Sequence, residues 1–445
     1  MSWRSESFGA LRHPIEPRIL FLRSDRAWRL PRFTARELWV ANAELIVPGF
    51  ERRLGTRPWL LRQLRYREDE GANRIDALFE LALRDPAWRP PAHGRWVGRD
   101  ELDGLRLRDD DQREPLAEYL EALECDEVPA ERPPWALPGW LDDVRVWLEP
   151  ELGRLGRTVR ELEQVKQWSI SSILRVRTDG PDYYFKVSAR LPLFVDEGPV
   201  TAMLARRFPG YVPEPLAVDA ERGWMLLSAF DEVVGWQAPL DVRCQVLTRF
   251  AGLQRQSAEH AGELVAAGCL DRRLEVLEEQ IEPLLADPDA VARLSPDEIE
   301  ELGRHVPVFR DACRRLADAG VPPTLVHGDL HVGNVARIGG ELVYFDWTDA
   351  CIAHPFIDLL SLQWERDETN RAALLDAYLQ GWEDVASPQL LREAASLAAV
   401  VTPLHHAVSY RTIVAGLEPA AKTELDATHG FLREALAQAR HWPPG

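Results

Sequence analysis

The chain is poor in lysine, in paired cysteines and in long apolar runs, and each shortage excludes a class of structure. Its 445 residues include only three lysines, Lys166, Lys186 and Lys422, among 53 basic residues. The five cysteines are far apart with no Cys-x-x-Cys spacing, which argues against a disulfide framework or a zinc site and favours the reducing cytoplasm. No run of 18 apolar residues and no signal-peptide core occurs, so a membrane span and secretion are not indicated.

Positive charge is also in short supply. The formal net charge is −19, so general affinity for nucleic acid or for an anionic membrane is not expected. An acidic surface would favour a cationic small-molecule partner. Hydrophobic residues make up 46% of the chain, enough for sizeable cores, and the length predicts two or three domains. The oligomeric state is left open.

A proline-rich stretch divides the chain. Residues 128–139 (VPAERPPWALPG) contain four prolines and read as a linker. Strand patterns are concentrated in residues 167–230, and helical patterns follow beyond 240. We therefore predict an α+β protein. It has a small α+β domain (1–127), the linker (128–139), a sheet-rich lobe with a leading helix (140–230) and a helical lobe (231–445).

The expected elements follow from periodicity and turn residues. In the first domain we expect strands at 19–23 and 79–83, and a helix over 36–54 that is interrupted at Pro48. Beyond the linker we expect a helix from Trp140 to about Leu162, split or kinked at Pro150. Strands at 167–178, 183–187 and 224–230, a helix at 198–207, and mostly helical structure over 242–316 and from 356 onward complete the prediction.

The stretch 324–349 (TLVHGDLHVGNVARIGGELVYFDWTD) carries the chemistry. It contains Asp329, then Asn334 five residues later, then Asp346 after an apolar strand and a glycine turn. Phosphoryl transfer needs an aspartate that accepts the proton of the attacking hydroxyl, and hard oxygen ligands that hold Mg²⁺ against the phosphates. Asp329 suits the first role, and Asn334 and Asp346 suit the second. A surface turn stabilised by Asp and Asn side chains is the alternative.

Such chemistry also needs a lysine facing the nucleotide phosphates and an acid that orients it. In DYYFKVSA, period-two alternation places Lys186 on one face of a strand, although an ordinary solvent-facing lysine would look the same. Glu197, just before a helical segment, is the preferred partner; Asp196 is its rival. Upstream, Ser169, Ser171 and Ser172 lie where a phosphate-covering loop belongs, or in a plain serine-containing hairpin.

HGDLHVGN followed by YFDWTD resembles the catalytic and metal-binding motifs of the aminoglycoside phosphotransferase and choline kinase-like family, over residues of roughly 140–445. The resemblance implies a protein-kinase-like two-lobe fold, ATP or GTP as co-substrate and Mg²⁺. It also implies that His327 braces the catalytic loop, that His331 lies near the transferred phosphate and that Asp358 steadies the loop. Ser228, Ala229 and Phe230 would form the hinge strand that binds adenine.

The first domain resembles Nudix hydrolases in ILFLRSDRAWRLP and in FELALRDPAWRPPAHGRWVGRDEL. The defining Nudix box is missing. If Gly55 is its last glycine, the metal-binding acids fall on Pro48-Gly49 and on Arg52-Arg53, and arginine cannot replace a carboxylate as a magnesium ligand. The resemblance therefore implies a Nudix-like domain without hydrolase activity; an unrelated α+β domain is the alternative.

The sequence as a whole predicts a kinase that phosphorylates a hydroxyl of a small molecule. A cationic acceptor could be held by acids of the helical lobe, or these acids could be a solvated helix face. They and a neighbouring tryptophan are Asp349, Trp364, Glu365, Asp367 and Glu368. A nucleotide-binding pseudokinase and a Nudix-type hydrolase are the competing functions. The identity of the acceptor, whether an aminoglycoside, a choline-like amine, an amino-alcohol, a sugar or a nucleoside, is not readable.

Overall fold

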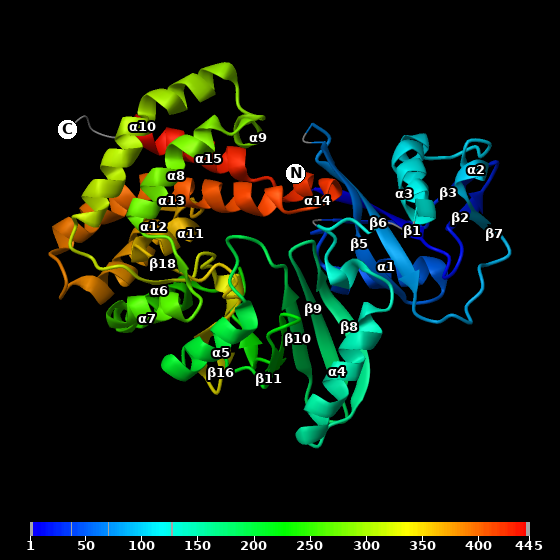
Figure 1. The fold of residues 1–445 in the computed structure, drawn as a ribbon, viewed down its shortest axis with the longest axis horizontal. Helices are drawn as coiled ribbons and strands as arrows, with labels where there is room; N and C mark the ends of the chain where they lie inside the picture. The colour runs from blue at the N-terminus through cyan, green and yellow to red at the C-terminus, as the bar shows by residue number, and fades with distance from the viewer. Residues whose placement is uncertain (1–2, 37, 70, 126–127, 442–445) are drawn as a thin grey trace. The chain divides into compact units, whose positions relative to one another are not determined.

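The computed structural model describes residues 3–36, 38–69, 71–125 and 128–441 (Figure 1). It divides into two compact units. The first contains Met1–Ala189 and Gly416–Leu425, and the second contains Arg190–Ala415 and Asp426–Gly445. The predicted α+β class is confirmed, because both units combine helices with sheets. The predicted domain boundaries at 127, 139 and 230 stay predictions.

The first unit begins with a mixed sheet in the order β4-β1-β6-β5. Strand β1 (Arg4–Leu11) runs parallel to β6 (Arg74–Leu83) and antiparallel to β4 (Arg32–Arg36), and β5 (Pro58–Asp69) closes the other edge. A second sheet has the order β3 (Ala27–Arg29), β2 (Ile19–Ser24) and β7 (Gly94–Val97). Helices α2 (Arg99–Leu102) and α3 (Arg113–Cys125) follow. The strands predicted at 19–23 and 79–83 are confirmed.

Helix α1 (Ala43–Leu54) packs against this mixed sheet and is not interrupted at Pro48 as predicted. Pro48 is the sixth of the twelve residues of the helix, so its missing N–H removes one intrahelical hydrogen bond without ending the helix. Gly49 has a packing reason, because a Cβ there would lie 2.5 Å from the Phe33 ring. The helix begins after Asn42, whose side chain accepts the Leu45 N–H, and ends at Gly55 in the left-handed conformation.

Residues 128–139 pack within the first unit. A 3-10 helix, Pro134–Ala136, buries Trp135, whose Nε1 donates to the Trp168 carbonyl at 2.6 Å. Helix α4 (Trp140–Arg154) then runs through Pro150 without a break and ends well before Leu162, so that part of the prediction is wrong. The end follows from Gly156, which takes a positive φ of 68° that glycine adopts readily.

Three antiparallel strands follow helix α4: β8 (Val159–Gln167), β9 (Ser171–Thr178) and β10 (Tyr183–Ser188). The prediction of strands at 167–178 and 183–187 is confirmed in large part, but the first residues of β8, up to Leu162, were predicted as helix. Its sequence, VRELEQVKQ, alternates charged and apolar residues imperfectly, so periodicity alone reads it as helical. Helix α14 (Pro419–Leu425) also belongs to the first unit.

The second unit is mostly helical. It opens with α5 (Glu197–Arg207) and the β11–β12 hairpin (Ala217–Asp219 and Trp224–Ser228). Its longer helices are α6 (Leu240–Ser257), α8 (Leu274–Ala286), α10 (Pro296–Ala317), α12 (Glu368–Leu379), α13 (Pro388–Ala415) and α15 (Thr428–Arg440). Short ones are α7 (Ala261–Ala266), α9 (Pro288–Val291) and α11 (Leu360–Gln363).

Two small sheets of the second unit carry the motif. One has the order β13 (Glu232–Val233), β16 (Val335–Ile338) and β17 (Glu341–Tyr344); the other has β14 (Leu270–Asp271), β18 (Cys351–Ala353) and β15 (Thr324–Val326). A single apolar core, which includes Phe250, Tyr344 and Trp347, fixes both sheets to the helices. The segments just after β15 and β17 therefore have rigid supports.

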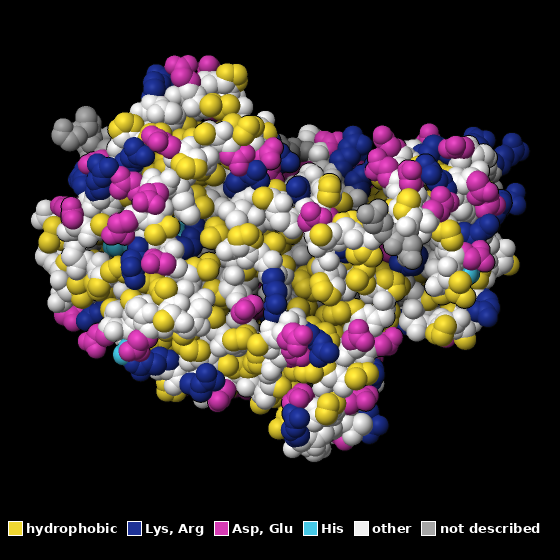
Figure 2. Space-filling model, viewed as in Figure 1, with side chains coloured by type: hydrophobic (Ala, Val, Ile, Leu, Met, Phe, Trp, Pro, Cys, Tyr) yellow, Lys and Arg dark blue, Asp and Glu magenta, His cyan; other side chains and the backbone are white. Residues whose placement is uncertain are grey.

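The surface agrees with the composition. On the face shown in Figure 2, acidic and basic side chains are interspersed, with no broad area of positive charge among the coloured residues. No helix in the described ranges is long and apolar enough to cross a membrane.

Candidate active site

His327 links the segment after β15 to the segment after β17. It follows β15 and is fully buried, and its Nε2 donates to the Phe345 carbonyl at 2.9 Å. Its Nδ1 accepts the Asp329 N–H at 3.3 Å. Burial lowers the pKa of His327, against the pull of nearby acids, so the ring is neutral with one donor and one acceptor nitrogen. The geometry agrees with the bracing role that the resemblance implies.

Gly328 is required by both its backbone conformation and its surroundings. Its φ is 82°, and a Cβ built there would lie 2.6 Å from the Cβ and 2.7 Å from the carbonyl oxygen of Asp349. Real Cβ atoms do not approach backbone so closely, so any side chain would push the His327–Asp329 turn away from Asp349.

Replacing Gly328 with alanine is therefore expected to displace Asp329 and lower kcat by about 10²-fold, since a 1 Å misplacement of a reacting group costs that much. The strained φ and the clash should also reduce the free energy of unfolding by about 1–3 kcal/mol. Steady-state kinetics and thermal unfolding measure both effects. Gly303→Ala is the matched control, because a Cβ at this helical glycine meets nothing within 4 Å. Wild-type kinetics in the Gly328 variant would contradict the packing argument.

Asp358, in the 3-10 helix Pro355–Leu359, stabilises the same His327–Asp329 turn by hydrogen bonds. Its Oδ2 accepts the His327 N–H and its Oδ1 accepts the Gly328 N–H, both at 2.9 Å. Gln254 of α6 donates to Oδ2 at 3.0 Å, and the Tyr378 hydroxyl donates to the Gln254 side-chain oxygen at 2.5 Å. Burial raises the pKa of Asp358 to about 7, even though the two backbone N–H groups favour its ionised form.

Asp329 and Asn334 form a bonded pair. The Asn334 amide nitrogen donates to both the carbonyl and the Oδ2 of Asp329, at 3.0 and 3.1 Å. The Asp329 side chain is 47% exposed, and its Oδ2 lies 3.5 Å from Nε2 of His331. Burial would raise the pKa of Asp329, but the hydrogen bond and charge of His331 outweigh it and hold that pKa below its ordinary value. A carboxylate that is ionised at neutral pH and reachable from solvent can accept a proton from a hydroxyl.

Asp346 follows β17 in a left-handed backbone conformation with φ of 68°. Such strain in a residue other than glycine costs about 1–3 kcal/mol and is found at functional sites. The Thr348 hydroxyl donates to its Oδ1 at 3.0 Å, and the Phe345 N–H donates to the Asn334 carbonyl at 3.0 Å. Asp346 is close enough to Asp329 for its charge to raise the Asp329 pKa. The second unit thus brings together the two acids and the amide that the motif predicts.

The donor set suits Mg²⁺. The Asn334 nitrogen makes both contacts to Asp329, so its amide oxygen takes no part in that pair and is a hard oxygen donor, as is the Asp346 carboxylate. Within the described ranges, no group of three or more His, Cys, Asp or Glu side chains could hold a metal ion.

Lys186 lies on β10 in the first unit and is buried, opposite Ile173 of β9. The hairpin before it carries the three serines. Ser171 and Ser172 are buried, and the Ser172 hydroxyl donates to the Gln167 side-chain oxygen at 2.8 Å, so this proton is already committed. The roles of Lys186, Ser169, Ser171 and Ser172 toward a nucleotide stay predictions.

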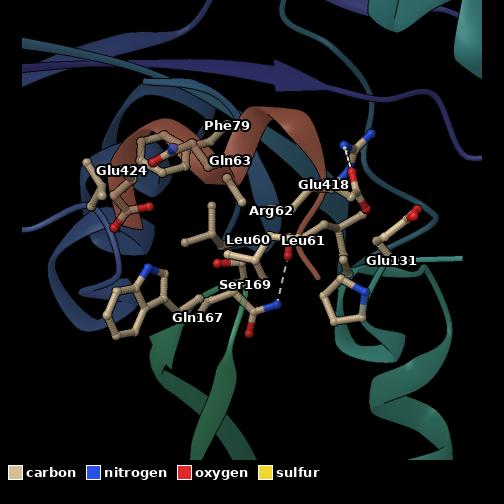
Figure 3. Close-up of a pocket in the computed structure, with 16 residues that line it drawn as sticks. Leu60, Leu61, Arg62, Gln63, Phe79, Glu131, Gln167, Ser169, Glu418 and Glu424 are labelled. Carbon is tan, nitrogen blue, oxygen red and sulfur yellow. Dashed lines mark hydrogen bonds and ion pairs between the residues drawn. The ribbon is translucent and has the colours of Figure 1, made fainter. Parts of the chain in front are cut away.

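Ser169 instead lines a narrow cavity inside the first unit, together with residues of β5 and α14 (Figure 3). Its hydroxyl has no hydrogen-bond partner there. The hairpin is anchored to the N-terminal sheet region, because Gln167 donates to the Leu61 carbonyl at 2.8 Å and to that of Trp135 at 2.9 Å. Burial raises the pKa of Glu424, on α14 at the same cavity, to about 7. The sequence shows the serines but not this anchoring, because Leu61 and Trp135 lie 106 and 32 positions before Gln167.

The other predicted nucleotide-binding residues lie in the second unit. Glu197 is the first residue of α5 and is buried, whereas the side chain of Asp196 is 62% exposed. The choice of Glu197 as the partner of Lys186 stays a prediction. Ser228 ends β12 and is exposed, Ala229 follows it, and the Phe230 ring lies 4.8 Å from that of Phe345. The predicted hinge therefore lies near the residue that precedes Asp346.

The five residues predicted to grip a cationic acceptor do not form one cluster. Trp364 and Glu365 line a cavity of about 270 Å³ next to His331. Asp367 caps α12 by accepting the N–H groups of Thr369 and Asn370, and the Glu368 side chain is 89% exposed. Asp349 lies against Gly328. For Asp367 and Glu368 the solvated helix end is therefore the better interpretation.

Comparison with known families decides the relationship. A sequence model of the phosphotransferase enzyme family (APH) matches residues 161–396, which include the whole motif. The chain belongs to this phosphotransferase family. The family predicted from HGDLHVGN and YFDWTD is therefore confirmed. Nothing tests the Nudix-like character of the first domain of this phosphotransferase, and it stays a prediction.

Solved structures of several kinases are similar to this phosphotransferase. A macrolide 2'-phosphotransferase type I is 20% identical over 63% of this chain and 95% of its own, with a TM-score of 0.46. A choline/ethanolamine kinase family protein from Mesorhizobium loti is 18% identical over 68% and 99%, with a TM-score of 0.47. Choline kinase LicA from Streptococcus pneumoniae is 15% identical over 66% and 99%, with a TM-score of 0.45. No curated protein matches the chain significantly.

Proposed function

We propose that this phosphotransferase moves the γ-phosphate of ATP or GTP to a hydroxyl of a small molecule. The observation that carries the proposal is the Asp329–Asn334 pair, held beside Asp346 on a braced turn, in a member of the phosphotransferase family. Phosphorylation of an alcohol needs an exposed carboxylate that acts as the base and, next to it, oxygen ligands for Mg²⁺.

In this proposal Asp329 accepts the hydroxyl proton and orients the attacking oxygen. Asn334 and Asp346 hold Mg²⁺, which when bound would neutralise charge on the phosphates. Lys186 contacts the α- and β-phosphates and Glu197 orients it, while backbone groups of Ser228–Phe230 bind the base. Catalysis comes mainly from positioning and charge, because the transferred group needs little covalent help.

The two competing functions are less well supported. A pseudokinase would lack part of the set Asp329, Asn334, Asp346 and Lys186, which is complete here. A Nudix-type hydrolase would need acids at Pro48, Gly49, Arg52 and Arg53, positions that lie on α1 and carry no carboxylate.

The test is a screen of purified protein with ATP, GTP and Mg²⁺ against a library of hydroxyl metabolites and antibiotics, read by nucleotide consumption and by mass spectrometry. We expect at least one acceptor to gain a single phosphoryl group in a Mg²⁺-dependent reaction. Tight nucleotide binding without any phosphorylated product across the library would favour the pseudokinase instead. An isolated 1–127 fragment that hydrolysed nucleoside diphosphate derivatives would support the Nudix alternative.

A further inference from the structure

The cavity beside His331 has a distinctive wall. It is enclosed by the catalytic turn, by α6 and by the segment from α11 to α12. Two tryptophans on its rim, Trp236 and Trp364, are 62% and 52% exposed, although exposed indoles are uncommon. Trp236 also stacks on His331 with ring centroids 4.6 Å apart. A ligand in this cavity would therefore cover aromatic surface while it lies next to the residue that contacts Asp329.

The rest of the lining is mainly apolar and contains one ion pair. The aliphatic residues are Val246, Leu247, Leu330, Val332, Leu362 and Leu374, and Ser361 adds a hydroxyl. Arg243 of α6 donates to Oε2 of Glu365 at 2.7 Å. The other oxygen of Glu365 accepts the Asp367 N–H at 3.0 Å. Both oxygens of the single carboxylate in the lining are thus engaged.

The Arg243–Glu365 pair determines which ligand charge the cavity favours. Two indoles alone would attract an ammonium group by cation–π interaction. Here the carboxylate that would complete a cation site is already paired with Arg243, whose side chain is 26% exposed, so the pair carries no net negative charge. An ammonium group that lost its water in this cavity would gain no carboxylate in exchange, and this desolvation penalty disfavours it. An uncharged apolar group meets no such penalty and gains from covering the indoles and aliphatic side chains.

We propose that the acceptor class is an uncharged alcohol with a bulky apolar body, which packs on Trp236 and Trp364 while the Arg243–Glu365 pair excludes ammonium groups. The inference rests on the proposed kinase function. The acceptor oxygen forms the new bond to the γ-phosphorus, and its proton passes to Asp329. The bond from that phosphorus to the β–γ bridging oxygen breaks, and the nucleoside diphosphate leaves with the electron pair.

Isosteric acceptors that differ only in charge test the proposal. One pair is 3,3-dimethyl-1-butanol and choline; a larger pair is 2-(4-tert-butylphenyl)ethanol and its 4-trimethylammonium analogue. We expect the neutral member of at least one pair to bind at least about tenfold more tightly, measured by quenching of tryptophan fluorescence and, for phosphorylated members, by kcat/KM. Equal or tighter binding of the cations would overturn the proposal. Failure of all four to bind would also overturn it, while phosphorylation of another acceptor in the screen would leave the kinase function standing.

Two substitutions link any preference to the ion pair. Arg243→Met frees the Glu365 carboxylate, so affinity for the cationic member should rise by about tenfold. Glu365→Gln leaves Arg243 alone, so cation binding should weaken further. Wild-type thermal unfolding and wild-type nucleotide affinity in both variants check that the protein is still folded. Arg433→Met is the matched control, because Arg433 pairs with Glu298 at 2.7 Å and does not line the cavity. If neither Arg243→Met nor Glu365→Gln changes the ratio of the affinities for the neutral and cationic members, the role of the pair is refuted.

Discussion

Replacing Asp329 with asparagine is expected to lower kcat by at least about 10³-fold, because general-base catalysis typically contributes 10²–10⁴-fold. Asparagine keeps the shape of the side chain and an oxygen that can accept the Asn334 amide. It cannot take the proton of the attacking hydroxyl at neutral pH. Nucleotide affinity should stay within about threefold, since the residues proposed to bind the phosphates and the base are unchanged. Single-turnover transfer measures the first effect, and calorimetric titration with a non-hydrolysable nucleotide measures the second.

A matched control is Asp376→Asn on α12, an aspartate that pairs with Arg392 at the surface and lies outside the motif. Its kcat should equal that of the wild type. Full activity of the Asp329 variant would refute the assignment of the base. A parallel loss of nucleotide binding would show instead that Asp329 acts through the metal or through the fold of the turn.

The motif was predictable because its parts are close in sequence. Asp329 and Asn334 are five residues apart, and the β16–β17 hairpin returns Asp346 to them, so local spacing fixes their meeting. Gln254 and Tyr378 were missed. Gln254 reaches Asp358 from a helix more than 100 residues upstream, and Tyr378, 20 residues downstream of Asp358, donates to Gln254 and to the Pro355 carbonyl. A polar residue inside an amphipathic helix gives no local sign of such a tertiary hydrogen bond.

The residues around the proposed acceptor cavity show a different limit of prediction from sequence. Acids near Trp364 could be recognised as a group, but sequence spacing could not show that Arg243, on a helix more than 100 residues earlier, already neutralises Glu365. Trp236, in a loop after β13, gave no periodic signal at all. Partners across a fold change the meaning of a charged residue, so the class of acceptor could only be argued from the structure.

Some strands of the first unit were not predicted from the sequence, for a further reason. Strand β5 reads PWLLRQLRYRED, and its arginines pair with acids of other elements, such as Arg62 with Glu80 and Glu418. Charged residues with such partners can occupy a half-buried strand face, which hides the alternation that strand prediction needs. Glu418, the residue before helix α14, lies 356 residues after Arg62 in sequence.

Asp358→Asn is expected to lower kcat by about 10²-fold, although Asp358 need not touch a substrate. Its ionised carboxylate accepts the His327 and Gly328 N–H groups, whereas asparagine would turn an NH₂ group toward one of them. A buried N–H without an acceptor costs about 1–3 kcal/mol, and the turn that carries Asp329 should shift to relieve it. Kinetics with thermal unfolding at pH 8 would separate a displaced turn from global unfolding, and Asp376→Asn again serves as the control.

The pH dependence makes this prediction specific. Burial raises the folded-state pKa of Asp358 to about 7, above an unfolded value of about 3.9. The protonated form therefore stabilises the fold; this contribution is fully present below about pH 4 and is lost as pH rises through about 7. Activity should change in the opposite direction, since only the ionised form accepts both N–H groups fully. Wild-type kcat should thus fall as pH drops below about 7, and Asp358→Asn should lose that limb while any limb due to nucleotide protonation persists. An identical acid limb in both proteins would assign it to the nucleotide and remove Asp358 from control of the turn.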